Sequence, residues 1–378
     1  MRALLVAAGV IVAGVVSQVN VLQPEAGSWR IGPDLAVPRA NHTATRLADG
    51  RVLVVGGLGA EGAVGLAEIY DANKDRWSSA GQILTPRWNH SATRVADGTV
   101  LVAGGEGPGG PPLKSAEVYS AGPNQWHAAS PLAHARYNHT ATLLRDGRVL
   151  VVGGEDAFGL MESAELYDPA TRTWSSAGSM RTPRSGHSAV MLRNGDVLVT
   201  GGETWGPTDE IYSPQSNRWS DAGPMMTPRA YQSTTALPNG KLLTVGGSRP
   251  GRSLPEAEIY DPGTAHWSAA RIAPSTRSAH QAVLLKSGWV LAVGGRDARD
   301  QELATVEMFD PQITRVWPAP SLHVARLDHT AIRLDDGNVL VVGGINHGHA
   351  IGTTELYQVG APHLFTSQSL ACIHGWGC

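Results

Sequence analysis

The chain has 378 residues, 42% of them hydrophobic, and carries a formal net charge of −3 with no block of basic residues. This charge excludes an electrostatic nucleic-acid binder. Glycine and proline are abundant, at 45 and 24 residues, but show no collagen period. Together with 11 tryptophans and regular apolar runs, this composition favours a turn-rich all-β domain over a disordered chain.

The first element is an unbroken apolar run from Ala3 to Val16, preceded by Arg2. A run of this length suits the core of a signal peptide and is short for a membrane span. We therefore expect a signal peptide over residues 1–17, a linker over 18–27, and a secreted or periplasmic protein with no stable membrane span after cleavage. The alternative is an uncleaved membrane anchor.

Seven repeats follow the linker, and each is predicted to form one propeller blade. In the first repeat, a strand beginning at His42 leads to an Asp-Gly turn, which glycine favours because it tolerates positive φ. A second strand ends in a Gly-Gly pair, a third contains Tyr70, and a fourth carries Trp77. Four antiparallel strands in about 48 residues are typical of a propeller blade. The Gly-Gly pairs begin at Gly56, Gly104, Gly153, Gly201, Gly246, Gly294 and Gly343.

The double glycine after an apolar strand, followed by Tyr and Trp with six residues between them, resembles the Kelch repeat. The Phe309/Trp317 pair departs by one residue from that spacing. The resemblance covers residues 28–358 and implies an all-β, seven-bladed Kelch propeller similar to the central domain of galactose oxidase. The spacing is kept by Tyr70/Trp77, Tyr119/Trp126, Tyr167/Trp174, Tyr212/Trp219 and Tyr260/Trp267.

The two ends of the repeat region predict how the ring closes. Trp29 precedes any first, second or third strand, whereas the third-strand motif TELY at 354–357 has no tryptophan after it. The strand around Trp29 should therefore supply the outer strand of the last blade. This arrangement leaves no open sheet edge.

The last segment, residues 359–378, is a tail that holds both cysteines of the chain. In an oxidising compartment, Cys372 and Cys378 favour a disulfide that closes a small loop. The alternative is a metal site formed by Cys372, His374 and Cys378.

Three residue columns recur in the repeats and are predicted to be structural. An arginine and a glutamate in every repeat indicate one buried ion pair per blade or blade junction, with an anion-binding arginine ring as the alternative. The histidine column indicates hydrogen-bonded structural side chains rather than metal ligands, because Gln232 replaces one of them. The arginines are Arg39, Arg87, Arg136, Arg184, Arg229, Arg277 and Arg326; the glutamates are Glu68, Glu117, Glu165, Glu210, Glu258, Glu307 and Glu355; the histidines are His42, His90, His139, His187, His280 and His329.

Hairpin topology places the segments before the histidines and after the Gly-Gly pairs on one face of the ring, opposite the Asp-Gly turns. The segments after Gly-Gly are long and variable, which is typical of binding loops on a rigid scaffold. Side chains that vary between repeats on this face are therefore the candidate ligand-binding residues. They are Asn41, Trp88, Asn89, Glu106, Tyr137, Asn138, Glu155, Glu203, Trp205, Tyr231, Arg296 and Asp328.

The most distinctive local feature is a glutamate after Gly-Gly in three successive repeats, Glu106, Glu155 and Glu203. Carboxylates and amides beside exposed aromatic rings suit a carbohydrate or protein ligand. We expect a monomeric binding or scaffold protein, with no cofactor, metal or catalytic residue assigned. The alternative is a carbohydrate-active enzyme of mutarotase or epimerase type that uses these carboxylates as acid and base.

Among Kelch propellers, galactose oxidase and a sialic-acid mutarotase make sugar chemistry an analogy. The copper oxidases of this family build their site with a tyrosine crosslinked to a cysteine within the propeller. This chain has no cysteine in the predicted ring. The resemblance therefore does not extend to a copper oxidase.

Overall fold

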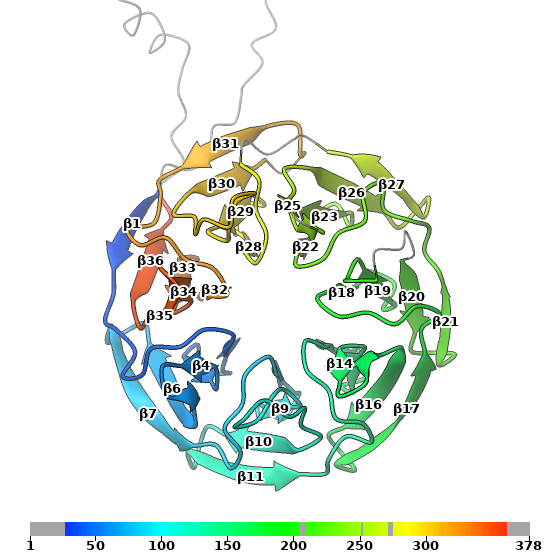
Figure 1. Cartoon of the computed structure of the whole chain (residues 1–378), viewed down its shortest axis with the longest axis horizontal. Coiled ribbons are helices and arrows are strands. Elements are labelled where there is room, and N and C mark those ends of the chain that lie inside the picture. Colours follow the sequence, from blue (N-terminus) through cyan, green and yellow to red (C-terminus); the bar gives the residue numbers. More distant parts are fainter. Residues whose placement is uncertain (1–26, 205–208, 251, 271–274, 311, 361–378) are drawn as a thin grey trace, which may run out of the picture.

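The computed structural model describes residues 27–204, 209–250, 252–270, 275–310 and 312–360. Seven four-stranded antiparallel sheets surround a central axis in a ring (Figure 1). The predicted seven-bladed propeller is therefore confirmed. The predicted signal peptide, Trp205 and residues 361–378 of the tail, which include both cysteines, lie outside the described residues. None of the described segments forms a helix long and apolar enough to cross a bilayer.

Blade 1 shows why each repeat folds as it does. From the axis outward, its strands are β2 (Thr43–Arg46), β3 (Val52–Val55), β6 (Leu66–Asp71) and β7 (Arg76–Gln82). All four residues of β3 are buried, because the sheet packs between two neighbouring sheets and both of its faces are covered. A continuous β-branched and aliphatic run suits a strand buried on both sides.

The remaining blades repeat this order of strands. Blades 2 to 4 contain β8 (Ser91–Arg94), β9 (Val100–Ala103), β10 (Ala116–Ser120) and β11 (Gln125–Ala129); β12 (Thr140–Leu143), β13 (Val149–Val152), β16 (Ser163–Asp168) and β17 (Thr173–Ser179); and β18 (Ser188–Met191), β19 (Val197–Thr200), β20 (Glu210–Ser213) and β21 (Arg218–Asp221). Blades 5 to 7 contain β22 (Ser233–Ala236), β23 (Leu242–Val245), β26 (Ala257–Asp261) and β27 (His266–Ala269); β28 (Gln281–Leu284), β29 (Val290–Val293), β30 (Val306–Phe309) and β31 (Val316–Ala319); and β32 (Thr330–Arg333), β33 (Val339–Val342), β36 (Thr354–Gln358) and β1 (Ser28–Ile31).

Four blades carry a small hairpin directly after the Gly-Gly pair, between the second and third strands of the blade. These hairpins belong to the segments that sequence analysis assigned to the binding face. They are β4 (Leu58–Gly59) with β5 (Gly62–Ala63), β14 (Glu155–Asp156) with β15 (Gly159–Leu160), β24 (Ser248–Arg249) with β25 (Arg252–Ser253), and β34 (Ile345–Asn346) with β35 (His349–Ala350).

The Gly-Gly pairs lie where neighbouring blades approach closely. A Cβ atom on Gly56 would be 2.3 Å from the carbonyl oxygen of Arg87 in the next blade and 2.6 Å from the ring of His90. A Cβ atom on Gly57 would be 2.8 Å from the carbonyl oxygen of Ala40 in its own blade. Both glycines also have positive φ, so no other residue fits without strain.

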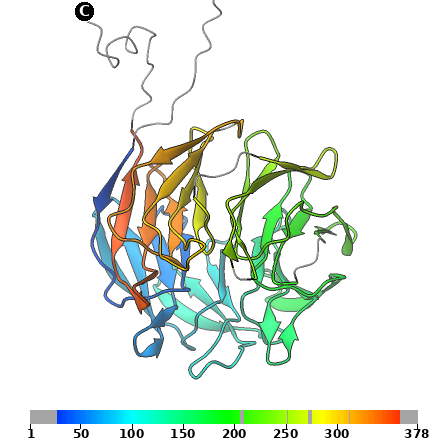
Figure 2. The same ribbon diagram turned by 45° about the horizontal axis from the view of Figure 1, so that its top comes forward.

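The ring closes as the sequence predicts. Strand β1 pairs with β36 in blade 7, with Trp29 opposite Tyr357, and the two strands lie side by side in both ribbon views (Figures 1 and 2). The Trp29 ring lies 5.1 Å from the Tyr357 ring, and its Nε1 donates a hydrogen bond of 2.7 Å to the carbonyl of Pro320 in blade 6. The ends of the propeller are therefore joined by side-chain packing as well as by a strand ladder.

Every predicted arginine–glutamate pair forms within its own blade. The seven guanidinium–carboxylate distances are 2.5 to 3.2 Å, and all seven arginine side chains are fully buried. This confirms the ion-pair interpretation and excludes an anion-binding ring built from these arginines. The same guanidinium groups donate to main-chain carbonyls; Arg39, for example, bonds to Gly56 and Leu66.

Candidate functional site

The channel along the axis opens through a ring of seven residues, one from each blade, all in the left-handed conformation with φ between 51° and 59°. Six main-chain hydrogen bonds of 2.8 to 3.3 Å link neighbouring members of this ring. Asparagine, aspartate and glycine adopt such φ values at low cost, but Tyr231 and Ala279 do so under strain. The ring consists of Asn41, Asn89, Asn138, Gly186, Tyr231, Ala279 and Asp328.

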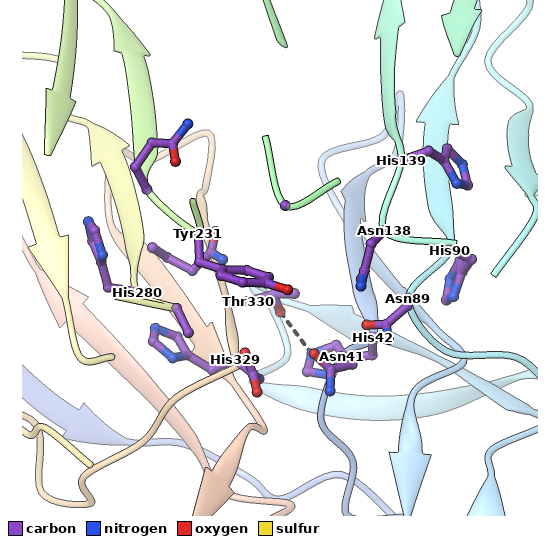
Figure 3. A pocket seen from close by; sticks show the side chains of 15 residues that line it. Asn41, His42, Asn89, His90, Asn138, His139, Tyr231, His280, His329 and Thr330 are labelled. Carbon is purple, nitrogen blue, oxygen red and sulfur yellow. Dashed lines mark hydrogen bonds between the residues drawn. The ribbon is translucent and has the colours of Figure 1, made fainter. Parts of the chain in front are cut away.

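The histidine column forms a second ring deeper in the channel. The Nε2 atom of His42 lies 2.9 Å from the hydroxyl of Thr330 in the preceding blade (Figure 3). His90, His139, His187 and His280 make equivalent contacts of 2.8 to 3.0 Å. Burial lowers the pKa of His42 and of His139 to about 3, so both are neutral at pH 7. The structural interpretation of these histidines is confirmed.

The histidine ring departs from this pattern at two places. In blade 5, Gln232 replaces the histidine and donates to the carbonyl of Thr200. The other departure is at the junction of blades 6 and 7. His329 is buried, and neither of its ring nitrogens has a hydrogen-bond partner within the described residues. The preceding blade carries Gln281 at the position where other blades supply a serine or threonine hydroxyl. This second departure therefore follows from a single substitution in the repeat.

Main-chain bridges join the segment before the histidine to the segment after the Gly-Gly pair. Trp88 bridges Glu106 in blade 2, and Tyr137 bridges Glu155 in blade 3. In blade 4 the Glu203 amide donates to the Ser185 carbonyl over 3.0 Å. The segments before the histidines and after the Gly-Gly pairs therefore share one face, as the hairpin topology predicts.

Each of the three predicted carboxylates is half-buried and accepts a hydrogen bond from a neighbouring polar side chain. The Asn89 amide donates to Glu106 over 2.8 Å, and the Tyr137 hydroxyl donates to Glu155 over 3.0 Å. The third pair crosses between blades. Tyr231 of blade 5 donates its hydroxyl to Glu203 of blade 4 over 2.5 Å.

The two tyrosines that donate to these carboxylates both have raised pKa values. Burial, the hydrogen bond to Glu155 and the nearby charges of Glu106 and Glu203 raise the pKa of Tyr137 to about 12. Burial and Glu203 also raise the pKa of Tyr231 well above its usual value. Both hydroxyls therefore stay protonated at neutral pH, and Tyr137 lies within electrostatic reach of all three glutamates.

A cavity of about 270 Å³ occupies the mouth of the channel. Five of the predicted ligand-binding residues line it: Asn41, Asn89, Asn138, Tyr231 and Asp328. Tyr231 projects toward the axis, facing Asn89 and Asn138 from the other side (Figure 3). Burial between the channel walls raises the pKa of Asp328 to about 6, an effect that the charge of Arg296 partly offsets.

The remaining predicted residues lie around this mouth. Glu203, Tyr231 and Arg296 line a second cavity of about 310 Å³, which extends over blades 4 to 6. Two bridged pairs on the same face, Trp88 with Glu106 and Tyr137 with Glu155, line neither cavity, so of the three predicted glutamates only Glu203 lines one.

Sequence analysis missed the other residues of the second cavity. Arg249 and Arg252 lie in the hairpin of blade 5 and contribute two further positive charges. The available signal was the SRPGRS segment, in which two arginines flank a Pro-Gly turn. In the described part of the chain, no group of three or more histidine, cysteine or acidic side chains is arranged to hold a metal ion.

A family model described as the KLHDC2/KLHL20/DRC7 Kelch-repeats domain matches residues 4–202 and 139–344. The chain therefore belongs to the Kelch-repeat family. A comparison with curated proteins found no match.

Solved structures share the fold at low sequence identity. A fungal alcohol oxidase of the AA5 family, in complex with copper, is 21% identical with a TM-score of 0.74, covering 91% of this chain and 78% of that one. YjhT is 16% identical with a TM-score of 0.58, covering 76% of this chain and 99% of that one. At these identities the likeness indicates a common propeller fold and carries no residue-level roles.

Proposed function

We propose that this protein is an exported carbohydrate-binding propeller whose ligand occupies the channel mouth on the Gly-Gly face. The observation that carries the proposal is the set of three half-buried carboxylates on this face, each bonded to an asparagine or tyrosine, two of which, Asn89 and Tyr231, also line the channel-mouth cavity. Carboxylates accept hydrogen bonds from sugar hydroxyls, and side-chain amides both donate and accept them. Tyrosine rings provide flat apolar surface.

Tyr231 supports the proposal independently. A bulky residue in the left-handed conformation costs of order 1–2 kcal/mol relative to its ordinary conformation. Strained residues persist where the surrounding structure holds them, and they cluster at functional sites. Here the strain directs an aromatic ring into the channel mouth beside Glu203.

A glycan-array screen of the purified protein, followed by titration of the best ligand, tests the proposal. Replacing Glu106, Glu155 and Glu203 together by glutamine should keep the melting temperature close to wild type, because glutamine retains an acceptor for each donor. It should also weaken ligand binding by at least tenfold, since hydrogen bonds to charged groups are worth about 1.5–3 kcal/mol each.

The matched control replaces Glu61 and Glu162 by glutamine. Both are exposed carboxylates in the segments after the Gly-Gly pairs, and this variant should bind like the wild type. Full-affinity binding by the triple variant would place the ligand elsewhere. Capture of a protein instead of any glycan would favour the scaffold alternative.

A second candidate function, sugar mutarotation, is favoured by the two tyrosine–glutamate pairs. A protonated tyrosine beside a carboxylate combines a proton donor with a proton acceptor. Nuclear magnetic resonance of a bound reducing sugar separates the two functions. Anomeric exchange faster than in buffer, and lost in the triple variant, would assign an enzyme; unchanged exchange would assign a binding protein.

A further inference from the structure

The second cavity, of about 310 Å³, differs from the channel mouth in its charge. Its walls include Arg249, Arg252 and Arg296 against two carboxylates, Glu203 and Asp300. The Glu203 carboxylate already accepts a hydrogen bond from the Tyr231 hydroxyl, so one of its oxygens is engaged. Tyr231 lines both cavities, which makes the second one a side pocket of the mouth.

Two of the arginines form an unfavourable pair. Arg249 and Arg252 lie directly opposite each other in the hairpin of β24 and β25. Like charges at such a position destabilise a hairpin. Within the described residues, neither side chain makes an ion pair that would offset the repulsion. The hairpin therefore holds two exposed guanidinium groups that form no ion pair with any described residue.

The third arginine is held beside this hairpin by a serine link. Ser253 is buried, and its hydroxyl lies 2.9 Å from the hydroxyl of Ser278 in blade 6. The Nε of Arg296 donates to the same Ser278 hydroxyl over 3.4 Å. Among the residues that the structure describes, the only ion pair of Arg296 is a 3.5 Å contact with Asp300, whose side chain is 81% exposed. The three positive charges thus converge across a blade junction with little neutralisation.

We propose that this pocket binds an oxyanion group of the ligand, a carboxylate, sulfate ester or phosphate ester. Planar guanidinium groups bind such groups through paired hydrogen bonds. The proposal of an oxyanion site depends only on the residues of this pocket. A second statement, that the anion is part of a saccharide whose hydroxyls face Glu203 and Tyr231, rests on the function proposed above.

Calorimetric titration with sodium sulfate, sodium phosphate and sodium acetate, at constant ionic strength set with chloride, tests the site. At least one of these anions should bind the wild-type protein. Arg252→Gln should weaken that binding at least tenfold, since a charge-assisted hydrogen bond is lost. Arg218→Gln, on the exposed outer strand β21, should leave it unchanged.

A second readout does not depend on binding. In chloride buffer, Arg252→Gln should melt at a higher temperature than the wild type, because the substitution relieves the repulsion from Arg249. Equal anion affinity in Arg252→Gln and wild type, or no response of the wild type to any of the three anions, would overturn the proposal. The anion that binds most tightly identifies the class of oxyanion.

The experiments can reject the oxyanion proposal and the carbohydrate proposal independently of each other. Anion binding that depends on Arg252, without binding of any glycan, supports the oxyanion pocket and rejects the carbohydrate proposal. Glycan binding that depends on the three glutamates, without response to any anion, supports the carbohydrate proposal and rejects the oxyanion pocket.

Discussion

Asp209 occupies a position in blade 4 where the other blades carry alanine, valine or threonine. It is buried, and its carboxylate accepts hydrogen bonds from the amides of Gly201, at 3.0 Å, and Met225, at 3.1 Å. In blade 3 the equivalent amides bond to the main-chain carbonyls of Ser163 and Glu162. One side chain in blade 4 therefore replaces two main-chain acceptors.

The buried Asp209 carboxyl makes the stability of the protein depend on pH. Burial raises the pKa of Asp209 to about 6, against 3.8 for an ordinary aspartate. Because the folded state binds the proton more tightly than the unfolded state, the contribution of Asp209 is most favourable below pH 4. It declines as the pH rises to 6 and is constant above.

Asp209→Asn should remove this decline, because asparagine does not titrate. The free energy of unfolding of the variant, relative to wild type, should rise by roughly 2 kcal/mol between pH 4 and 7. Urea denaturation at several pH values measures the difference. A constant offset from lost hydrogen bonds is expected, but a difference that does not change with pH would contradict the assignment.

At the scale of the element, each buried glutamate holds the segment that enters its blade. The carboxylate of Glu117 accepts the amides of Leu84 and Thr85, at 2.7 and 2.9 Å, and the guanidinium of Arg87, at 2.7 Å. The segment containing Leu84 and Thr85 connects the outer strand of blade 1 to the inner strand of blade 2. The ion pair thus fixes one blade against the next.

Glu117→Gln should destabilise the protein by about 3–5 kcal/mol, because it leaves the buried Arg87 charge without a counter-charge. The control is Arg30→Gln, which removes an ion pair to Asp75 whose side chains are 39% and 42% exposed. An exposed pair of this kind contributes about 0–1 kcal/mol. Equal losses in chemical denaturation for the two variants would show that burial does not decide the contribution of these pairs.

At the scale of the whole molecule, blade 7 is the only blade assembled from both ends of the described chain. Its outer strand β1 is separated from β36 by more than 300 residues of sequence, yet the two are paired over four residues. The cost of closing such a long loop is offset by the ladder, by the Trp29–Tyr357 contact and by the hydrogen bond to Pro320.

Trp29→Ala should therefore lower the free energy of unfolding by about 3–5 kcal/mol. It should also loosen the pairing of β1 with β36 more than the pairing in the other blades. Hydrogen exchange should speed up first in β1 and β36. The matched control is Trp126→Ala, which removes the same side chain from blade 2, where the four strands are continuous in sequence. Exchange that rises equally in all blades of the Trp29 variant would refute a localised closure.

The fold was predictable from the sequence because the chain can be compared with itself. Seven copies of the Gly-Gly, arginine, glutamate, histidine and tryptophan columns define the blades, the ion pairs and the structural histidines. The mismatch between Trp29 and the motif at 354–357 is sufficient to predict closure. Each of these features depends on contacts within one repeat or between neighbouring repeats, and the repeat fixes such contacts.

The candidate site depends on departures from the repeat, and the sequence alone placed these only on a face. The tertiary structure decided their partners: Glu203 pairs with Tyr231 of the next blade, and Arg249 and Arg252 meet Arg296 across a junction. Side-chain direction at these positions depends on φ at Tyr231 and on hairpin register at Arg249, neither of which a periodic pattern encodes. The periodic columns determined the scaffold, whereas contacts between non-equivalent residues of adjacent blades determined the site.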